Sequence, residues 1–185
     1  MVTFETITRE EYKANPPKFK IIYGLHATPF GKCLIGITDT DKAIVYLGFV
    51  DKALSTELTI LKNDWPLTKV VEDSSNETEK SITQIFSEDA FEDDSLLVLL
   101  KGTEFQTQVW KSLLSISPGT STTYEKVAQS IGKPKAIRAV ANAIMNNKVA
   151  FLVPCHRVMG KSGSNKYTWG VERKQNILSY ENKSQ

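Results

Sequence analysis

The chain has 185 residues, of which 41% are hydrophobic and 24% are charged, so it has enough apolar side chains for a core and is not expected to be disordered. The sequence contains no apolar run near the ~20 residues of a membrane span, and residues 1–17 lack the apolar stretch of a secretory signal. Two cysteines do not make a disulfide framework, and this favours a reducing, intracellular compartment. The net charge of +2 is unevenly spread: residues 1–100 hold 10 basic and 17 acidic residues, whereas residues 101–185 hold 13 basic and 4 acidic ones. This asymmetry points to nucleic acid as a partner of the second half, with a solvated basic surface as the alternative.

The first half of the chain predicts a small sheet with helices. Three short apolar segments separated by turn-forming residues predict hairpin strands: residues 19–25, 31–37 and 43–49. Apolar residues at helical spacing predict a helix over 51–65, and a second helix is expected over 77–86. The acidic stretch 87–94 is expected to be a solvated linker, followed by a last strand over 95–100. The overall fold class is therefore α+β, with residues 1–95 as an N-terminal structural domain.

The second half, residues 96–185, is expected to form a mostly helical domain. Three amphipathic segments predict helices: residues 103–116, 123–131 and 134–145. Thr103 is expected to cap the first and Thr122 or Thr123 the second, which Gly132 ends. The last two helices and the turn between them have the proportions of a helix-turn-helix, with an ordinary helical hairpin as the alternative.

The helix over 134–145 is expected to present two different faces. The residues expected to pack inward are Ile137, Val140, Ala141 and Ile144. The residues expected on another face are Arg138, Asn142 and Met145. Three alanines, Ala136, Ala139 and Ala143, are expected to keep the surface shallow, so that a DNA backbone can come close.

The segment FLVPCHRVMG, residues 151–160, places a cysteine beside a histidine. Because Pro154 is awkward in a central strand, we expect Cys155 at a strand end that opens into a site; an inert buried thiol is the alternative. A free thiol has a pKa of about 8.5, so activation requires a proton acceptor. Adjacent side chains of an extended segment point to opposite faces, so His156 is expected to act through a water molecule or a local bend. The acids after residue 100, any of which could orient the histidine, are Glu104, Glu125, Glu172 and Glu181.

Metal and nucleotide motifs are missing from the sequence. The possible nitrogen and sulfur ligands, Cys33, Cys155, His26 and His156, have no CxxC or HxxxH spacing, so no metal site is expected. The glycines follow neither the GxxxxGK[ST] nor the GxGxxG order. The sequence therefore contains neither of these two nucleotide-binding motifs.

The segments GKPKAIRAV and PCHRV, together with Asn147 eight residues before the cysteine, closely resemble the O6-alkylguanine-DNA alkyltransferases, also called methylated-DNA–protein-cysteine methyltransferases. The resemblance is strong over residues 102–181 and weaker around PFGKCLIG. It implies a ribonuclease-H-like N-terminal domain before a helical domain whose helix-turn-helix enters the minor groove. It also implies a monomer without a cofactor or membrane contact, which repairs double-stranded DNA containing O6-alkylguanine in the cytoplasm or, in a eukaryote, the nucleus.

The resemblance also implies catalytic roles. The Cys155 thiolate attacks the alkyl carbon of a flipped guanine, and the product is a thioether, so each molecule works once. His156 relays a proton through water and Glu181 hydrogen-bonds His156, while Asn147 braces the site. Tyr124 helps to rotate the nucleotide and donates toward N3 of the base.

The resemblance further implies residues for DNA and for the base. Arg138 fills the place that the flipped base leaves. The other residues implied in DNA binding are Tyr124, Lys135, Ala136, Ala139 and Asn142. The residues implied in the substrate pocket are Val158, whose carbonyl reads the exocyclic amine together with that of Cys155, and Tyr167, Thr168 and Trp169 of the covering loop.

Two other functions fit parts of the sequence. A non-catalytic sensor of alkylated DNA would bind without forming a covalent product, although the presence of Cys155 argues against it. A cysteine hydrolase using Cys155, His156 and Glu181 would turn over esters or amides, but no oxyanion motif is identifiable.

The loop between Cys155 and Tyr167 is one residue shorter than in relatives, which affects the contacts implied for Thr168.

Overall fold

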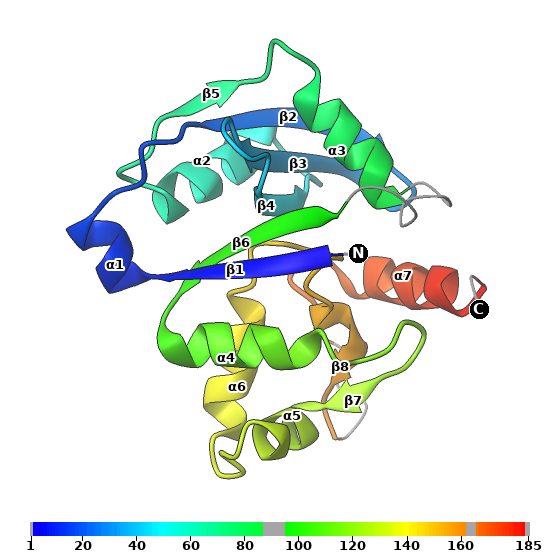
Figure 1. Cartoon of the computed structure of the whole chain (residues 1–185). Helices are drawn as coiled ribbons and strands as arrows, with labels where there is room; N and C mark the ends of the chain where they lie inside the picture. Colours follow the sequence, from blue (N-terminus) through cyan, green and yellow to red (C-terminus); the bar gives the residue numbers. More distant parts are fainter. Residues whose placement is uncertain (1, 87–94, 162–165, 184–185) are drawn as a thin grey trace. The chain divides into compact units, whose positions relative to one another are not determined.

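The structure, a computed structural model, describes residues 2–86, 95–161 and 166–183. The chain forms two compact units, Met1–Gly102 and Thr103–Gln185, and has a mixed α/β fold (Figure 1). The division lies after Gly102 rather than after residue 95, because the strand predicted at 95–100 pairs within the first unit. Among the described residues, none of the helices has the length and hydropathy that a membrane span requires.

A six-stranded mixed sheet in the order β1-β6-β4-β3-β2-β5 is the centre of the first unit. Its strands are β1 (Val2–Thr8), β2 (Ile21–Thr28), β3 (Gly31–Thr38), β4 (Ile44–Phe49), β5 (Val70–Glu72) and β6 (Leu96–Gly102). The strands β2, β3 and β4 form the two predicted antiparallel hairpins, while β6 runs parallel to both β1 and β4. The alternation of buried and half-buried residues along β6 is typical of a strand in a sheet.

The first unit also contains α1 (Arg9–Ala14), α2 (Leu54–Asp64) and α3 (Glu77–Phe86). A side chain at Gly36 of β3 would meet Leu61 of α2, and one at Gly24 of β2 would meet Thr78 of α3. Gly24 pairs with Ile35, the neighbour of Gly36, so the two glycines face opposite sides of the sheet. Therefore α2 and α3 cover opposite faces.

The sequence predictions for the first unit identify its apolar strands and its longer helices, but not one more polar strand and two short elements. The prediction of a helix over 77–86 is confirmed by α3, and that of 51–65 by the slightly shorter α2. The sequence analysis missed β1, α1 and β5, because only three of the seven β1 residues are apolar and the other two elements are very short. The predicted acidic linker, residues 87–94, lies outside the described residues.

The second unit is mostly helical. Its elements are α4 (Glu104–Leu113), β7 (Thr122–Thr123), α5 (Tyr124–Ser130), α6 (Ile137–Met145), the 3-10 helix η1 (Cys155–Arg157), β8 (Val158–Met159) and α7 (Val171–Lys183). The indole nitrogen of buried Trp110 donates to the Ala143 carbonyl at 2.9 Å and so joins α4 to α6. The short strands β7 and β8 pair in parallel beside the 3-10 helix.

The helix ends of the second unit follow the predicted signals with one exception. Thr103 caps α4 in a reciprocal capping box with Gln106, and Thr123 caps α5. Gly132 ends α5 with a φ of 71°, and the hydrogen bonds around it form a Schellman motif. The exception is α6, which begins at Ile137, so that Pro134 lies in the turn before it.

The prediction of which α6 residues face inward is partly wrong. Val140 and Ile144 are buried as expected, but Ile137 is 39% exposed and Ala143 is only 2% exposed. Ala143 lies inside because its backbone carbonyl accepts the indole proton of Trp110, and a small side chain lets the indole approach. Ile137 lies at the first residue of the helix, at the edge of the buried face.

Candidate active site

The cysteine beside the histidine lies at the start of η1, not at the end of a strand as predicted. Pro154 precedes this 3-10 helix, and tight hydrogen bonds join the amide of Cys155 to the carbonyl of Val153 and the amide of Leu152 to that of Ala150. The chain therefore turns sharply before the cysteine. Cys155 is 5% exposed and reaches a cavity of about 320 Å³.

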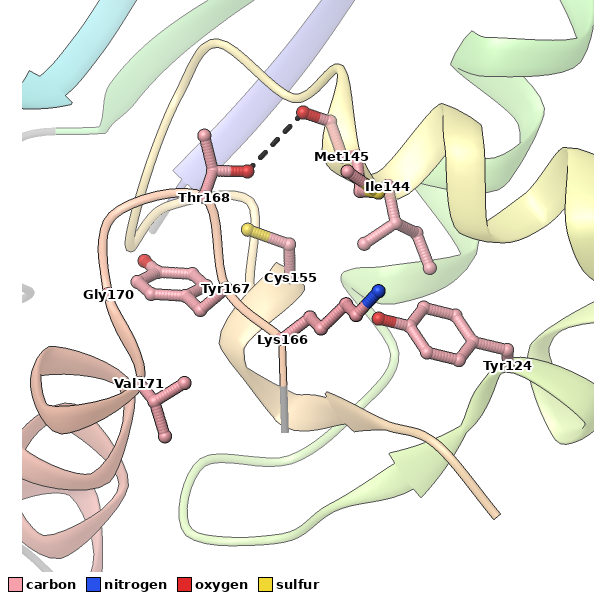
Figure 2. A pocket seen from close by; sticks show the side chains of 9 residues that line it. All are labelled: Tyr124, Ile144, Met145, Cys155, Lys166, Tyr167, Thr168, Gly170 and Val171. Carbon is pink, nitrogen blue, oxygen red and sulfur yellow. Dashed lines mark hydrogen bonds between the residues drawn. The ribbon is translucent and has the colours of Figure 1, made fainter. Parts of the chain in front are cut away.

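Figure 2 shows the thiol between two tyrosines. The residues that line the cavity are Tyr124, Ile144, Met145, Cys155, Lys166, Tyr167, Thr168, Gly170 and Val171. Tyr124 comes from the start of α5, and Tyr167 and Thr168 come from the segment before α7. Thr168 donates to the Met145 carbonyl at 3.4 Å, which joins that segment to α6.

Two residues predicted for the pocket lie behind its wall. Trp169 is buried and packs edge-to-face against Tyr167, with ring centroids 5.4 Å apart. Val158 is buried in β8, and its carbonyl accepts a hydrogen bond from the ammonium of Lys174 at 2.6 Å. The structure thus gives Trp169 a supporting place behind Tyr167.

Asn147 links the sulfur to the irregular segment before it. Its side-chain nitrogen lies 3.2 Å from the Cys155 sulfur and 3.1 Å from each of the Val149 and Val153 carbonyl oxygens. Its side-chain oxygen accepts from the Val149 amide at 2.9 Å. Asn147 is 2% exposed, so the buried Val149 amide would lack a partner without it. The two carbonyls would each keep one backbone hydrogen bond.

His156 is fully buried and paired with Glu181. The His156 Nε2 atom lies 2.7 Å from a Glu181 carboxylate oxygen, and the Phe151 ring, whose residue has a φ of 65°, stacks on the imidazole at 6.2 Å. Burial lowers the pKa of His156, although the hydrogen bond to Glu181 opposes this effect. A neutral imidazole that donates from Nε2 has its acceptor lone pair on Nδ1. Among the described residues, this buried Nδ1 has no hydrogen-bond partner, so it is available as a proton acceptor.

Glu181 accepts hydrogen bonds from groups other than His156. It also accepts from the Arg157 guanidinium, at 2.7 Å from Nη2, and from the Gly119 amide at 2.9 Å. Burial raises the pKa of this carboxyl, but the hydrogen bonds from His156 and Arg157 prevail and lower it to about 2. The carboxylate is therefore ionised at neutral pH. The sequence analysis gave Arg157 no role.

A lysine that the sequence analysis missed lies near the thiol. Lys174 of α7 is fully buried, and its ammonium donates to the Val158 carbonyl and, at 3.4 Å, to the Lys166 carbonyl. Burial raises the pKa of Cys155 to about 11, while the Asn147 hydrogen bond and the charge of Lys174 oppose that rise. Lys174, Ile177 and Glu181 recur at a spacing of three and four, which places them on one helix face. That spacing is the signal that could have identified Lys174.

Replacing Lys174 by methionine should slow alkylation of Cys155 at neutral pH by about tenfold, because loss of one nearby positive charge raises the thiol pKa by about one unit. The measurement is the pH dependence of modification by iodoacetamide, which should shift to higher pH in the variant. Lys166→Met is the matched control, since Lys166 lines the same cavity but is exposed. An unshifted pH profile in Lys174→Met would show that its charge does not act on the sulfur.

The residues predicted to contact DNA lie mainly on one element. Lys135, Arg138, Ala139 and Asn142 are exposed, and Ala136 is half-buried. These residues occupy the turn before α6 and α6 itself, whereas Tyr124 lies in the cavity wall. No acidic residue occurs in the sequence between Glu125 and Glu172, so this region is positively charged.

The described residues contain no group of three or more histidine, cysteine or acidic side chains that could hold a metal ion. His26 and Cys33 are paired positions on β2 and β3, and His26 is hydrogen-bonded to Thr78 at 2.9 Å. Cys33 is fully buried, and burial raises its pKa to about 12. The two cysteines therefore differ in access, because only Cys155 lines the cavity beside the histidine–glutamate pair.

The comparisons with known proteins agree with this geometry. Residues 104–183 match the family described as "6-O-methylguanine DNA methyltransferase, DNA binding domain". The chain is 33% identical over 160 residues to a methylated-DNA–protein-cysteine methyltransferase of Methanosarcina barkeri, covering 86% of this chain and 96% of that protein. It is 32% identical over 182 residues to the bifunctional transcriptional activator/DNA repair enzyme Ada of Escherichia coli, covering 95% of this chain and 49% of that protein.

A solved structure supports the same relationship. The crystal structure of Mycobacterium tuberculosis OGT in complex with DNA is similar with a TM-score of 0.67 and 29% identity, over 88% of this chain and 94% of that one. The chain spans about half the length of the first curated relatives that it matches. The similarity to the Methanosarcina protein nevertheless extends over nearly all of that relative. The chain therefore belongs to the O6-alkylguanine-DNA alkyltransferase family, the methylated-DNA–protein-cysteine methyltransferases.

Proposed function

We propose that this protein repairs DNA by moving an alkyl group, chiefly methyl, from O6 of guanine to its own Cys155. The observation that carries the proposal is a thiol that lines a cavity, with Asn147 on its sulfur and the buried His156–Glu181 pair next to it in the chain. The names of the relatives and the DNA complex of the Mycobacterium protein support it. The partner would be double-stranded DNA that carries O6-alkylguanine.

The proposed reaction is a single displacement in which the atoms balance. The thiol proton leaves through a water molecule to Nδ1 of His156, and Glu181 stabilises the imidazolium that forms. The sulfur then bonds to the alkyl carbon as the bond from that carbon to O6 breaks. The electron pair of that bond goes to the guanine, which finally takes up the proton that the thiol lost.

The raised thiol pKa makes this proton acceptor necessary. With a pKa of about 11, few Cys155 thiols are ionised at neutral pH, so attack requires that the proton be taken as the substrate binds. Burial and the nearby Cys155 charge raise the pKa of Tyr124, which keeps its hydroxyl protonated. Tyr124 would therefore donate a hydrogen bond to N3 of the leaving base and stabilise the charge that develops there.

The product explains why no cofactor and no second cycle are expected. The alkylated base is itself the alkyl donor, so the reaction consumes only the thiol. A thioether has no carbonyl for water to attack, and no step in the site restores the sulfur. Each molecule would therefore repair one base.

DNA binding would be the task of the positively charged part of the second unit. We propose that α5, the turn and α6 form a helix-turn-helix that enters the minor groove, with Arg138 occupying the place of the flipped base. The first unit would be a ribonuclease-H-like structural domain, and the protein would act as a monomer. Since its substrate is DNA, we expect it in the compartment that holds the genome.

Replacing Arg138 by alanine should slow repair of duplex DNA by at least about tenfold, because the side chain that stabilises the flipped state would be lost. Reaction with free O6-methylguanine, which needs no flipping, should change little. The measurement compares the two rates in the same variant, and Lys111→Ala, another exposed cation, is the matched control. Equal losses on both substrates would show that Arg138 does not serve flipping.

The proposed activity can be tested by intact mass. After incubation with a duplex that contains O6-methylguanine, the protein should gain one methylene, located on the peptide that contains Cys155. Cys155→Ser should gain none, whereas Cys33→Ser should react normally. Tight binding without a covalent product would indicate a sensor of alkylated DNA, turnover on esters or amides would indicate a hydrolase, and modification of Cys33 would contradict the assignment of the nucleophile.

A further inference from the structure

A second cavity lies entirely within the first unit, and none of its lining residues has been given a role above. It has a volume of about 480 Å³ and is lined by Arg9, Tyr12, Lys13, Asn63, Asp64, Pro66, Leu67 and Lys101. Its walls come from α1, the end of α2 and β6, so segments distant in sequence meet there. This volume falls within the usual range for small-molecule sites, and the proposed alkyl transfer does not use the cavity.

The inner wall of the cavity holds a buried cation on an aromatic support. The Lys101 side chain is only 6% exposed, and its ammonium lies 5.1 Å from the Tyr12 ring centroid and 5.2 Å from that of Trp65. Asp64 lies 3.5 Å from the same ammonium. The aromatic rings and this carboxylate hold the ammonium in place, so it is an organised donor rather than a mobile surface group.

Two further cations face the same cavity without neutralising partners. Arg9 and Lys13 are four residues apart on α1, which places them on one face of that helix. Both are exposed, and neither makes a hydrogen bond or ion pair within the described part of the chain. Their charges act on Lys101 strongly enough to contribute to lowering its pKa, after the larger effect of burial. Three cations and one carboxylate thus line the cavity, leaving an excess of two positive charges.

The remaining lining residues indicate what would accompany an anion. Pro66 and Leu67 form an apolar edge of the cavity, and Leu67 is 52% exposed, so its side chain is accessible to a ligand. The Asn63 side chain, also exposed, supplies a neutral hydrogen-bonding group. The Tyr12 hydroxyl is already held by Thr68 and by the Leu67 amide, so the ring rather than the hydroxyl is the available surface of Tyr12.

We propose that this cavity binds a small phosphorylated molecule with a planar apolar portion, of the nucleoside monophosphate class. A phosphate monoester carries a charge of about −1.5 to −2 at neutral pH, which matches the excess of positive charge in the cavity. Arg9 would bind the phosphate oxygens with its guanidinium fork, with Lys13 and Lys101 beside it. The planar portion would lie along Pro66 and Leu67. The site would operate independently of Cys155.

The test is calorimetric titration of the full chain with adenosine monophosphate, inorganic phosphate and adenosine. We expect one adenosine monophosphate per protein, weaker binding of phosphate alone and none of adenosine, with an affinity that falls as salt increases. The double variant Arg9→Gln/Lys13→Gln should bind at least about tenfold more weakly, because two positively charged donors to the phosphate are lost. Both replaced residues are exposed, so the variant should keep its melting temperature.

The matched control is Lys18→Gln/Lys52→Gln, which removes two exposed positive charges of the same unit outside the cavity and should bind normally. Three results would overturn the proposal: no binding of adenosine monophosphate, equal binding by both double variants, or stronger binding of adenosine than of its phosphate. If Arg9→Gln/Lys13→Gln weakens binding of undamaged duplex DNA while adenosine monophosphate fails to bind, the cations serve DNA and the small-molecule site is rejected. Alkyl transfer by the double variant to free O6-methylguanine should be normal, so this test is separate from that of the proposed function.

Discussion

Replacing Glu181 by glutamine is expected to lower the free energy of unfolding by about 3 kcal/mol and the rate of alkyl transfer by about 100-fold. The carboxylate accepts hydrogen bonds from His156, Arg157 and Gly119 in a buried site. A glutamine leaves the Arg157 charge without its counterion and cannot stabilise an imidazolium. The rate is measured with duplex DNA containing O6-methylguanine, and stability by urea denaturation. Glu172→Gln is the matched control, because Glu172 is exposed on the same helix.

The depressed pKa of Glu181 also predicts how stability depends on pH. In the folded protein this pKa is about 2, against an ordinary value of 4.5. The Glu181 carboxylate therefore binds a proton more readily in the unfolded chain. Its contribution to the free energy of unfolding is full above about pH 4.5 and is lost as the pH falls toward 2. Over that window the wild type should lose about 3 kcal/mol that Glu181→Gln does not lose. Parallel declines in the two proteins would show that Glu181 is not the responsible group.

The second large effect is expected at Asn147. Asn147→Ala should lower the free energy of unfolding by about 2 to 4 kcal/mol, because the buried amide of Val149 and the carbonyls of Val149 and Val153 lose a hydrogen-bond partner. It should also slow alkyl transfer, since the hydrogen bond that lowers the thiol pKa of Cys155 disappears. The thiolate absorbance of the variant should therefore appear at higher pH than in the wild type.

The neighbouring residue provides a control for this prediction. Asn146→Ala removes the same chemical group from the adjacent position, where the side chain hydrogen-bonds to Asn142 and to no other residue that the structure describes. That change should cost less than about 1 kcal/mol and leave the thiol titration unchanged. If both variants behaved alike, the contact between Asn147 and the sulfur would have no part in tuning the thiol.

The sequence predicted best what depends on neighbouring residues. The hairpins of β2, β3 and β4, the limits of α3 and the caps at Thr103 and Thr123 follow from local periodicity and turn chemistry, and the structure agrees with them. The prediction of which α6 residues are buried was partly wrong, because Trp110 determines which side of the helix packs inward. Trp110 is 33 residues from Ala143, with which it is hydrogen-bonded. A distant partner of this kind leaves no trace in the pattern of the helix itself.

In the candidate site, too, some residues were predicted from the sequence and others are seen only in the folded chain. The resemblance indicated Cys155, His156, Asn147 and Glu181, and the structure brings these four together. The bidentate hold of Arg157 on Glu181 and the buried ammonium of Lys174 were not predicted, because a charged residue is ordinarily assigned to the surface. Only the folded chain shows that α7 turns Lys174 inward, toward the Val158 carbonyl.

The deep placement of the Cys155 sulfur has a consequence for the lifetime of the protein in a cell. Because burial raises the pKa of Cys155 to about 11, very few molecules carry a thiolate at pH 7. Because peroxides and soluble electrophiles attack thiolates, they would react slowly with the protonated Cys155 thiol before a substrate base binds. Under the proposed function, the unused thiol would therefore remain available for damaged DNA.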